Sequence, residues 1–152
     1  MRSNGVKNKQ RTTVLKYPVL PRTILLCDYS LGGFRPPEMV KRRPAVVITG
    51  VLPRRNNLHT IVPLSGTPSD ERNLYHCRIE LPQPLPAPFA ETVWWVKADM
   101  LATVGFERLD LFRTERDQHG RRKYLTNLRV SEQQFEAIMV AVRYALGISL
   151  DK

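Results

Sequence analysis

Cysteine is scarce in this sequence of 152 residues, which contains only Cys27 and Cys77. The two cysteines lie far apart and form no C-x-x-C pair, which excludes the usual zinc and redox motifs. We therefore expect two small buried thiols in a reducing cytoplasm. No apolar run approaches the roughly 18–20 residues that cross a bilayer, and the basic first residues lack the apolar core of a secretory signal. These absences predict a cytoplasmic protein that does not cross a membrane.

The sequence also lacks the motifs of several common enzyme classes. It has no glycine-rich phosphate loop and no cluster of carboxylates, so an NTPase or a metal-dependent nuclease is not expected. His59, His76 and His119 do not have the spacing of metal ligands or of a catalytic triad. We therefore predict no metal site, no cofactor and no catalysis centred on histidine.

Acidic residues are outnumbered: 14 of them stand against 24 lysines and arginines, which gives a formal net charge of +10. Such an excess favours a polyanionic partner such as nucleic acid, although a simple surface charge is the alternative. Residues 1–16 carry five basic residues and no acidic one, with little to bury, which predicts a disordered basic arm. The remainder, 17–152, is expected to form one domain around one core.

The most informative stretch runs from residue 38 to residue 67. Two segments rich in strand-forming residues, 45–49 and 58–62, flank a polar segment at 53–57 whose composition is that of a turn. This pattern predicts a β-hairpin.

The hairpin is expected to bring polar side chains together at its open end. With the loop centred near Arg55, antiparallel pairing places Thr67 opposite Arg43 and Ser65 opposite Ala45. The side chains of Arg43, Ser65 and Thr67 then share one face of the sheet, and Glu38 folds back onto it from just upstream. A carboxylate, a guanidinium and hydroxyl groups therefore meet at one place.

The rest of the chain predicts a mainly β fold with one helix. Ser131 and Gln134 form a capping box, and Gly147 ends the helix. The apolar stripe of this helix comprises Phe135, Ile138, Met139, Val142 and Leu146. Further strands are expected at 23–29, 75–81, 92–96 and 97–104, with a loop at 30–37 and a hairpin over 110–129 that turns at 117–120. Trp94 and Trp95 are expected to fill a core or a dimer interface, with stacking on bases as the alternative. Many short strands with one terminal helix suit a small barrel.

Three segments in this order resemble the toxins of the MazF/PemK family, and the likeness covers roughly residues 22 to 148. The segments are Arg43-Pro44-Ala45-Val46-Val47-Ile48, Ile61-Val62-Pro63-Leu64-Ser65 and Val96-Lys97-Ala98-Asp99-Met100-Leu101-Ala102-Thr103-Val104. The resemblance implies an SH3-like barrel with a C-terminal helix. It also implies a metal-independent endoribonuclease of a toxin–antitoxin pair, which cuts single-stranded RNA to leave a 2′,3′-cyclic phosphate and a 5′-hydroxyl. The implied partners are a second copy of the chain and a cognate antitoxin whose acidic tail competes for the RNA groove.

The resemblance also assigns roles to residues. Arg43 takes the central catalytic position, and its planar guanidinium is suited to bidentate binding of phosphate. Ser65 stands where the family usually has threonine, and it keeps the hydroxyl but loses the methyl group that stiffens χ1. Glu38 matches the acidic position of a general base. Lys97 and Asp99 match a basic-x-Asp element used by some members, and Thr67 is a further candidate from the hairpin geometry.

Basic residues around these positions predict a surface for RNA. The expected RNA-binding residues, in addition to Arg43, are Arg35, Lys41, Arg42, Arg54 and Arg55. Two other functions remain open. A gyrase poison like CcdB shares the barrel, but this chain ends at 147–152 without the aromatic motif of those toxins. A catalytically silent nucleic-acid-binding module is compatible with the serine at position 65.

Overall fold

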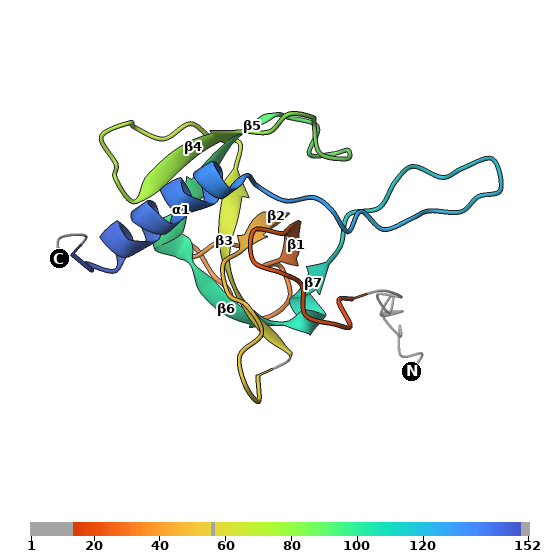
Figure 1. Cartoon of the computed structure of the whole chain (residues 1–152), viewed down its shortest axis with the longest axis horizontal. Helices are drawn as coiled ribbons and strands as arrows, with labels where there is room; N and C mark the ends of the chain where they lie inside the picture. Colours follow the sequence, from red (N-terminus) through yellow and green to blue (C-terminus); the bar gives the residue numbers. More distant parts are fainter. Residues whose placement is uncertain (1–13, 56, 150–152) are drawn as a thin grey trace, which may run out of the picture.

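The longest strand, β3 (Leu58–Ser65), is the centre of the sheet (Figure 1). The computed structural model describes residues 14–55 and 57–149. Strand β3 pairs with β2 along one edge; its other edge pairs first with β6 and then, at the very end, with β5. The remaining elements are β1 (Ile24–Asp28), β2 (Arg42–Val47), β4 (His76–Glu80), β5 (Val93–Lys97), β6 (Ala102–Gly105), β7 (Leu109–Asp110) and α1 (Glu132–Ala145), with short 3₁₀ turns at Ala98–Met100 and Phe106–Arg108.

The seven strands are antiparallel and the predicted fold class, mainly β with a C-terminal helix, is confirmed. The strand order is β4-β5-β3-β2-β1-β7, with β6 attached to β3. Within the described residues this path is open, since its two end strands do not pair with each other. The sheet therefore curves like a barrel without closing into one.

Two prolines end the ladder between β2 and β3. The last registered pair is Ala45 with Pro63, although β2 continues to Arg42 and β3 to Ser65. Proline has no N–H to donate, and both Pro44 and Pro63 lie at this point of the hairpin. The two strands consequently continue past their last pair without a ladder between them, and their ends carry polar side chains.

The core lies on both faces of the sheet because side chains alternate along each strand. One cluster, which includes Val46, Val62 and Val96, packs beneath α1 against Ile138 and Val142. A second cluster lies on the opposite face and contains Leu25, Cys27, Tyr29, Ala45, Val47 and Ile61. Arg43 lies on the same face of β2 as Ala45 and Val47, because residues two apart on a strand share a face. An arginine therefore lies at the edge of the second apolar cluster.

Helix α1 begins at the predicted capping box. Ser131 Oγ accepts a hydrogen bond from the N–H of Gln134 at 3.0 Å, and the Gln134 side chain accepts one from the N–H of Ser131 at 2.9 Å. Ile138 and Val142 are buried as expected, but Leu146 is 54% exposed. The prediction for Leu146 is wrong because the helix ends at Ala145.

The hairpin over 110–129 forms an extended arm (Figure 1) that turns at 117–120. It contains an isolated bridge between Arg113 and Tyr124, and the N–H of Thr114 donates to the carbonyl of Lys123 at 2.8 Å. Residues 1–13 of the predicted disordered arm lie outside the described residues, but Leu15 is buried and its N–H donates to the carbonyl of Leu109 at 2.7 Å. The domain therefore begins before residue 17.

Across residues 14–55 and 57–149, no helix has the length and apolar character needed to cross a membrane.

Candidate functional site

A row of side chains crosses five strands at the end of the β2–β3 hairpin. Trp95 of β5 pairs with Ser65 of β3 and with Arg78 of β4. On the other side, Arg43 of β2 pairs with Cys27 of β1. The register of β2 on β3, continued two residues past its last pair, sets Arg43 level with Ser65. Since residues opposite each other in antiparallel strands share a face, these five side chains form one transverse row.

This register corrects the sequence prediction. Ser65, and not Thr67, lies level with Arg43, because the hairpin turns at Pro53 and Arg54 and not at Arg55. The shift is two residues, so the predicted common face of Arg43 and Ser65 is kept. Thr67 lies beyond the end of β3 and is exposed.

The guanidinium of Arg43 is half-buried and available for a ligand. Its Nε is buried and has no hydrogen-bond partner among the described residues. Loss of water around the side chain lowers the pKa of Arg43, and the nearby Tyr29 hydroxyl acts in the opposite direction. An arginine nevertheless stays protonated at any working pH. A buried charged donor without a partner is costly unless an anion completes its hydrogen bonds, so this group is suited to bind phosphate.

Ser65 is buried beside Arg43 and keeps a donor for a ligand. Its Oγ accepts a hydrogen bond from the backbone N–H of Thr67 at 3.2 Å. A hydroxyl has one proton to donate in addition to the bonds that it accepts. The turn after β3 therefore fixes the Ser65 oxygen and leaves the proton of its hydroxyl available to an anion at Arg43.

Lys97 and Asp99 lie next to this row, at the end of β5 and in the 3₁₀ turn that follows. The pKa of Lys97 is lowered, chiefly by burial and further by the charge of Arg43, while Asp99 opposes the shift. Both charged groups are therefore close enough to Lys97 to influence its titration. Arg43 and Asp99 therefore both lie near Lys97, and Ser65 lies level with Arg43 in the transverse row.

His76 also lies at this site, although the sequence analysis gave no histidine a role there. It pairs with Lys97 across β4 and β5, and its Nε2 donates to Asp99 Oδ1 at 2.8 Å. Because a carboxylate only accepts, Nε2 carries the proton, and in the neutral ring Nδ1 accepts from the hydroxyl of Ser69. His76 therefore orients Asp99. Its only sequence signal was its place on the polar face of an alternating strand, since its partners are 7 and 23 residues away.

Glu38 lies at a cavity of about 430 Å³ that Tyr29 and Asp99 also line. Among the described residues it forms no ion pair with Arg43. Tyr29 lies between this cavity and the transverse row, because it lines the cavity and its hydroxyl lies near the Arg43 guanidinium. The loop 30–41 places Glu38 at this cavity beside Tyr29 and Asp99, and not in an ion pair with Arg43.

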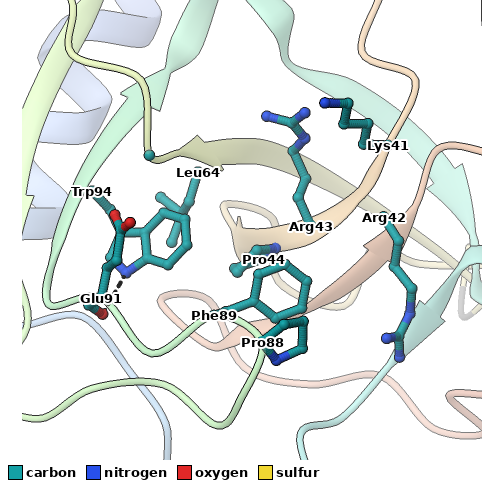
Figure 2. A pocket seen from close by; sticks show the side chains of 10 residues that line it. Lys41, Arg42, Arg43, Pro44, Leu64, Pro88, Phe89, Glu91 and Trp94 are labelled. Atoms are coloured by element: carbon teal, nitrogen blue, oxygen red, sulfur yellow. Dashed lines mark hydrogen bonds between the residues drawn. The ribbon is translucent and has the colours of Figure 1, made fainter.

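The predicted basic surface is divided between two ends of the sheet. Lys41 and Arg42 line a cavity together with Arg43, and Figure 2 shows Arg42 pointing to the opposite side of β2 from Arg43. Arg54 and Arg55 lie in the turn at the other end of β3, roughly 23 Å away along the strand. Arg35 lies in the exposed loop before Glu38. A single surface of six basic residues is therefore not formed.

The described part of the chain contains neither a cluster of metal ligands nor an exposed cysteine. Nowhere in residues 14–55 and 57–149 do three or more His, Cys, Asp or Glu side chains gather in a way that holds a metal ion. Cys27 is buried, and burial raises the pKa of the half-buried Cys77 to about 11. Cys77 therefore remains a thiol at neutral pH.

Comparison with known proteins gives a family and a fold. Residues 21–146 match the family described as PemK-like, MazF-like toxin of type II toxin–antitoxin system. Among solved structures, the chain is similar to an endoribonuclease from a mycobacterial species, with 18% identity and a TM-score of 0.56 over 87% of this chain and 94% of that one. A mycobacterial endoribonuclease in complex with its cognate antitoxin matches with 19% identity and a TM-score of 0.54, over 87% and 98%. MazF from Deinococcus radiodurans matches with 15% identity and a TM-score of 0.54, over 88% and 100%. No curated protein matches the chain.

Proposed function

Since the chain belongs to the family of PemK-like and MazF-like toxins of type II toxin–antitoxin systems, we propose that it is an endoribonuclease that cuts single-stranded RNA without a metal ion. The observation that carries this proposal is the half-buried Arg43, whose Nε lacks a partner among the described residues and which lies level with the hydroxyl of Ser65. A guanidinium and a hydroxyl on one face form a cradle for a single phosphate.

The proposed reaction is an attack of the RNA 2′-oxygen on the adjacent phosphorus. A carboxylate removes the 2′-hydroxyl proton, the bond from O2′ to phosphorus forms, and the bond from phosphorus to O5′ breaks. Asp99 and Glu38 are the carboxylates that line the neighbouring cavity. Arg43 and Ser65 donate hydrogen bonds to the phosphate oxygens as their charge increases. The products are a 2′,3′-cyclic phosphate and a 5′-hydroxyl, whose oxygen takes up a proton.

This proposal is tested by incubating the purified protein with single-stranded RNA in the presence of a chelator. We expect cleavage to continue, with a 2′,3′-cyclic phosphate on one product and a 5′-hydroxyl on the other. A substrate with a single 2′-deoxy nucleotide at the cleavage position is expected to stay intact, because it lacks the attacking oxygen. A requirement for a divalent ion, or cleavage of the 2′-deoxy substrate, would contradict the mechanism. RNA binding without cleavage would support the silent module, and loss of DNA supercoiling activity in a gyrase assay would support the poison.

Lys97 is the proposed donor of the proton to the 5′-oxygen. Its lowered pKa makes it a better acid than an exposed lysine. Only the protonated amine can act, and this form exists below the pKa. The cleavage rate is therefore expected to fall as the pH rises through the lowered pKa of Lys97, which lies below the ordinary lysine value of about 10.4. Arginine stays protonated and does not release its proton. Lys97→Arg should therefore cleave more slowly and lose the alkaline fall, as measured in rate profiles corrected for spontaneous hydrolysis. An identical profile in the variant would rule out this role.

We also propose the partners. The related mycobacterial endoribonuclease was solved with its cognate antitoxin, and the net charge of +10 favours an antitoxin with an acidic segment here as well. The same charge favours RNA. A homodimer with RNA in the groove between its subunits, acting in the cytoplasm, completes the proposal.

A further inference from the structure

A second cavity lies beside Arg43 and is not used by the proposed reaction. It has a volume of about 260 Å³ and extends to the side of β2 toward which Arg42 points (Figure 2). Lys41 and Arg42 give it positive charge, Phe89 and Trp94 give it aromatic walls, and Glu91 is its only acidic residue. Figure 2 shows Glu91 and Trp94 on one side of this cavity and Arg42 on the other, with Phe89 between them.

Glu91 is an exposed residue whose backbone is fixed beside the cavity and whose carboxylate lies over Gly66. The indole N–H of Trp94 donates to the backbone carbonyl of Glu91 at 3.0 Å, which fixes the main chain there. Glu91 Oε2 lies over Gly66, only 3.1 Å from the position that a Cβ on this glycine would occupy. In the described part of the chain no hydrogen bond or ion pair is formed by this carboxylate. Two acceptor oxygens therefore remain available to a ligand beside an aromatic wall.

We propose that this cavity binds a guanine base of the RNA substrate. Its volume is slightly below the roughly 300–1,000 Å³ of pockets for drug-sized ligands, and it suits one flat ring system. Bases of single-stranded RNA are recognised by stacking on aromatic side chains and by hydrogen bonds to their Watson–Crick edges. An ionised carboxylate only accepts hydrogen bonds. Guanine is the one standard base whose Watson–Crick edge has two neighbouring donors, N1–H and the N2 amino group, and it matches both oxygens of Glu91.

The position of the cavity places this guanine next to the scissile phosphate. Gly66 lines the cavity and directly follows Ser65, so their Cα atoms are about 3.8 Å apart. Arg42 and Arg43 are likewise consecutive and point to opposite sides of β2 (Figure 2). A nucleotide whose phosphate is bound by Arg43 can therefore pass over the bare Gly66 and insert its base beside Glu91. This inference rests on the proposed function, since it names the substrate of the same site.

The test is a binding experiment on the full chain that does not depend on cleavage. Labelled 2′-O-methyl pentanucleotides, which lack the attacking hydroxyl, carry guanine, inosine, adenine, cytosine or uracil between uracils. We expect the guanine pentamer to bind about 10- to 100-fold more tightly than the inosine pentamer, which lacks only the N2 amino group, because hydrogen bonds to a charged group are strong. In Glu91→Ala this difference should disappear. Glu136→Ala removes the same charge from the exposed face of α1 and should keep the difference.

Equal binding of the five pentamers, or a guanine preference that persists in Glu91→Ala, would overturn the inference. Cleavage of unmodified RNA separates it from the proposed function. If the protein cuts RNA without preference for guanine near the cut, the pocket assignment fails while the function stands. If it binds guanine selectively but never cuts, the function fails while the pocket stands. A uniform loss of cleavage at all sequences in Glu91→Ala would instead identify Glu91 as a catalytic base and refute the role in base recognition.

Discussion

Arg43→Ala is expected to lower the single-turnover rate of RNA cleavage by at least about 100-fold, because removing one donor that stabilises a developing oxyanion typically costs 10²–10³-fold. Arg43 supplies a full positive charge in a half-buried place, where electrostatic interactions are stronger than in water. The folded protein should not lose stability in this variant, since the Arg43 Nε is buried without a partner among the described residues. Thermal unfolding followed by circular dichroism checks this point.

Two variants give this prediction its controls. Arg54→Ala removes the same charge at the far end of β3, in the turn after β2, and should change the cleavage rate little beyond a general weakening of RNA binding. Arg43→Lys keeps the charge but loses the planar, bidentate donor, so it should recover only a small part of the activity. Equal rates for Arg43→Ala and Arg54→Ala would show that positive charge near the RNA, and not this guanidinium, accounts for activity.

Ser65→Ala is expected to lower the cleavage rate by roughly 10²-fold with little change in RNA affinity, because the lost hydrogen bond is strongest in the transition state. The Oγ of Ser65 accepts from the N–H of Thr67 at 3.2 Å, so its proton points elsewhere. Single-turnover rates and binding of an uncleavable RNA separate the two effects. A variant that binds RNA more weakly but cleaves at an unchanged rate would show that Ser65 serves only binding.

Thr67→Ala is the matched control, because it removes a hydroxyl two residues away that is exposed beyond the end of β3. The rate should stay within a few-fold of the wild-type rate. Ser65→Thr keeps the hydroxyl and restricts χ1, so it tests whether the serine limits the activity. A large loss in Thr67→Ala would instead favour the register predicted from the sequence, in which Thr67 faces Arg43.

The sequence predicted those parts of the fold whose causes are local. The capping box of Ser131 and Gln134 needs only a four-residue segment, and the structure contains both of its hydrogen bonds. Alternation identified β4, because a strand with one polar face shows its period within five residues. The end of α1 was misplaced by one residue, since Leu146 was expected to pack and Ala145 is the last helical residue.

The site was predictable only as far as the hairpin determined it. Arg43 and Ser65 share a face because the register error of two residues leaves the alternation unchanged. Arg54 has a φ of 62° in the turn, a left-handed backbone conformation that is uncommon for arginine and that the sequence therefore does not predict. The position of Glu38 depends on the conformation of the loop 30–41. The contacts of His76 on β4 with Ser69 and Asp99 join segments 7 and 23 residues apart, and no pattern along the chain encodes such contacts.

The residues of the transverse row belong to strands that the ribosome synthesises at different times. Arg43 and Ser65 leave the ribosome well before β5, which supplies Trp95 and Lys97 and pairs with β3 only at Leu64 and Ser65. A nascent chain that stops before residue 93 therefore contains the guanidinium and the hydroxyl but lacks the strand that borders them. Such a fragment is therefore expected to lack the proposed cleavage activity, which needs β5 in addition to the β2–β3 hairpin.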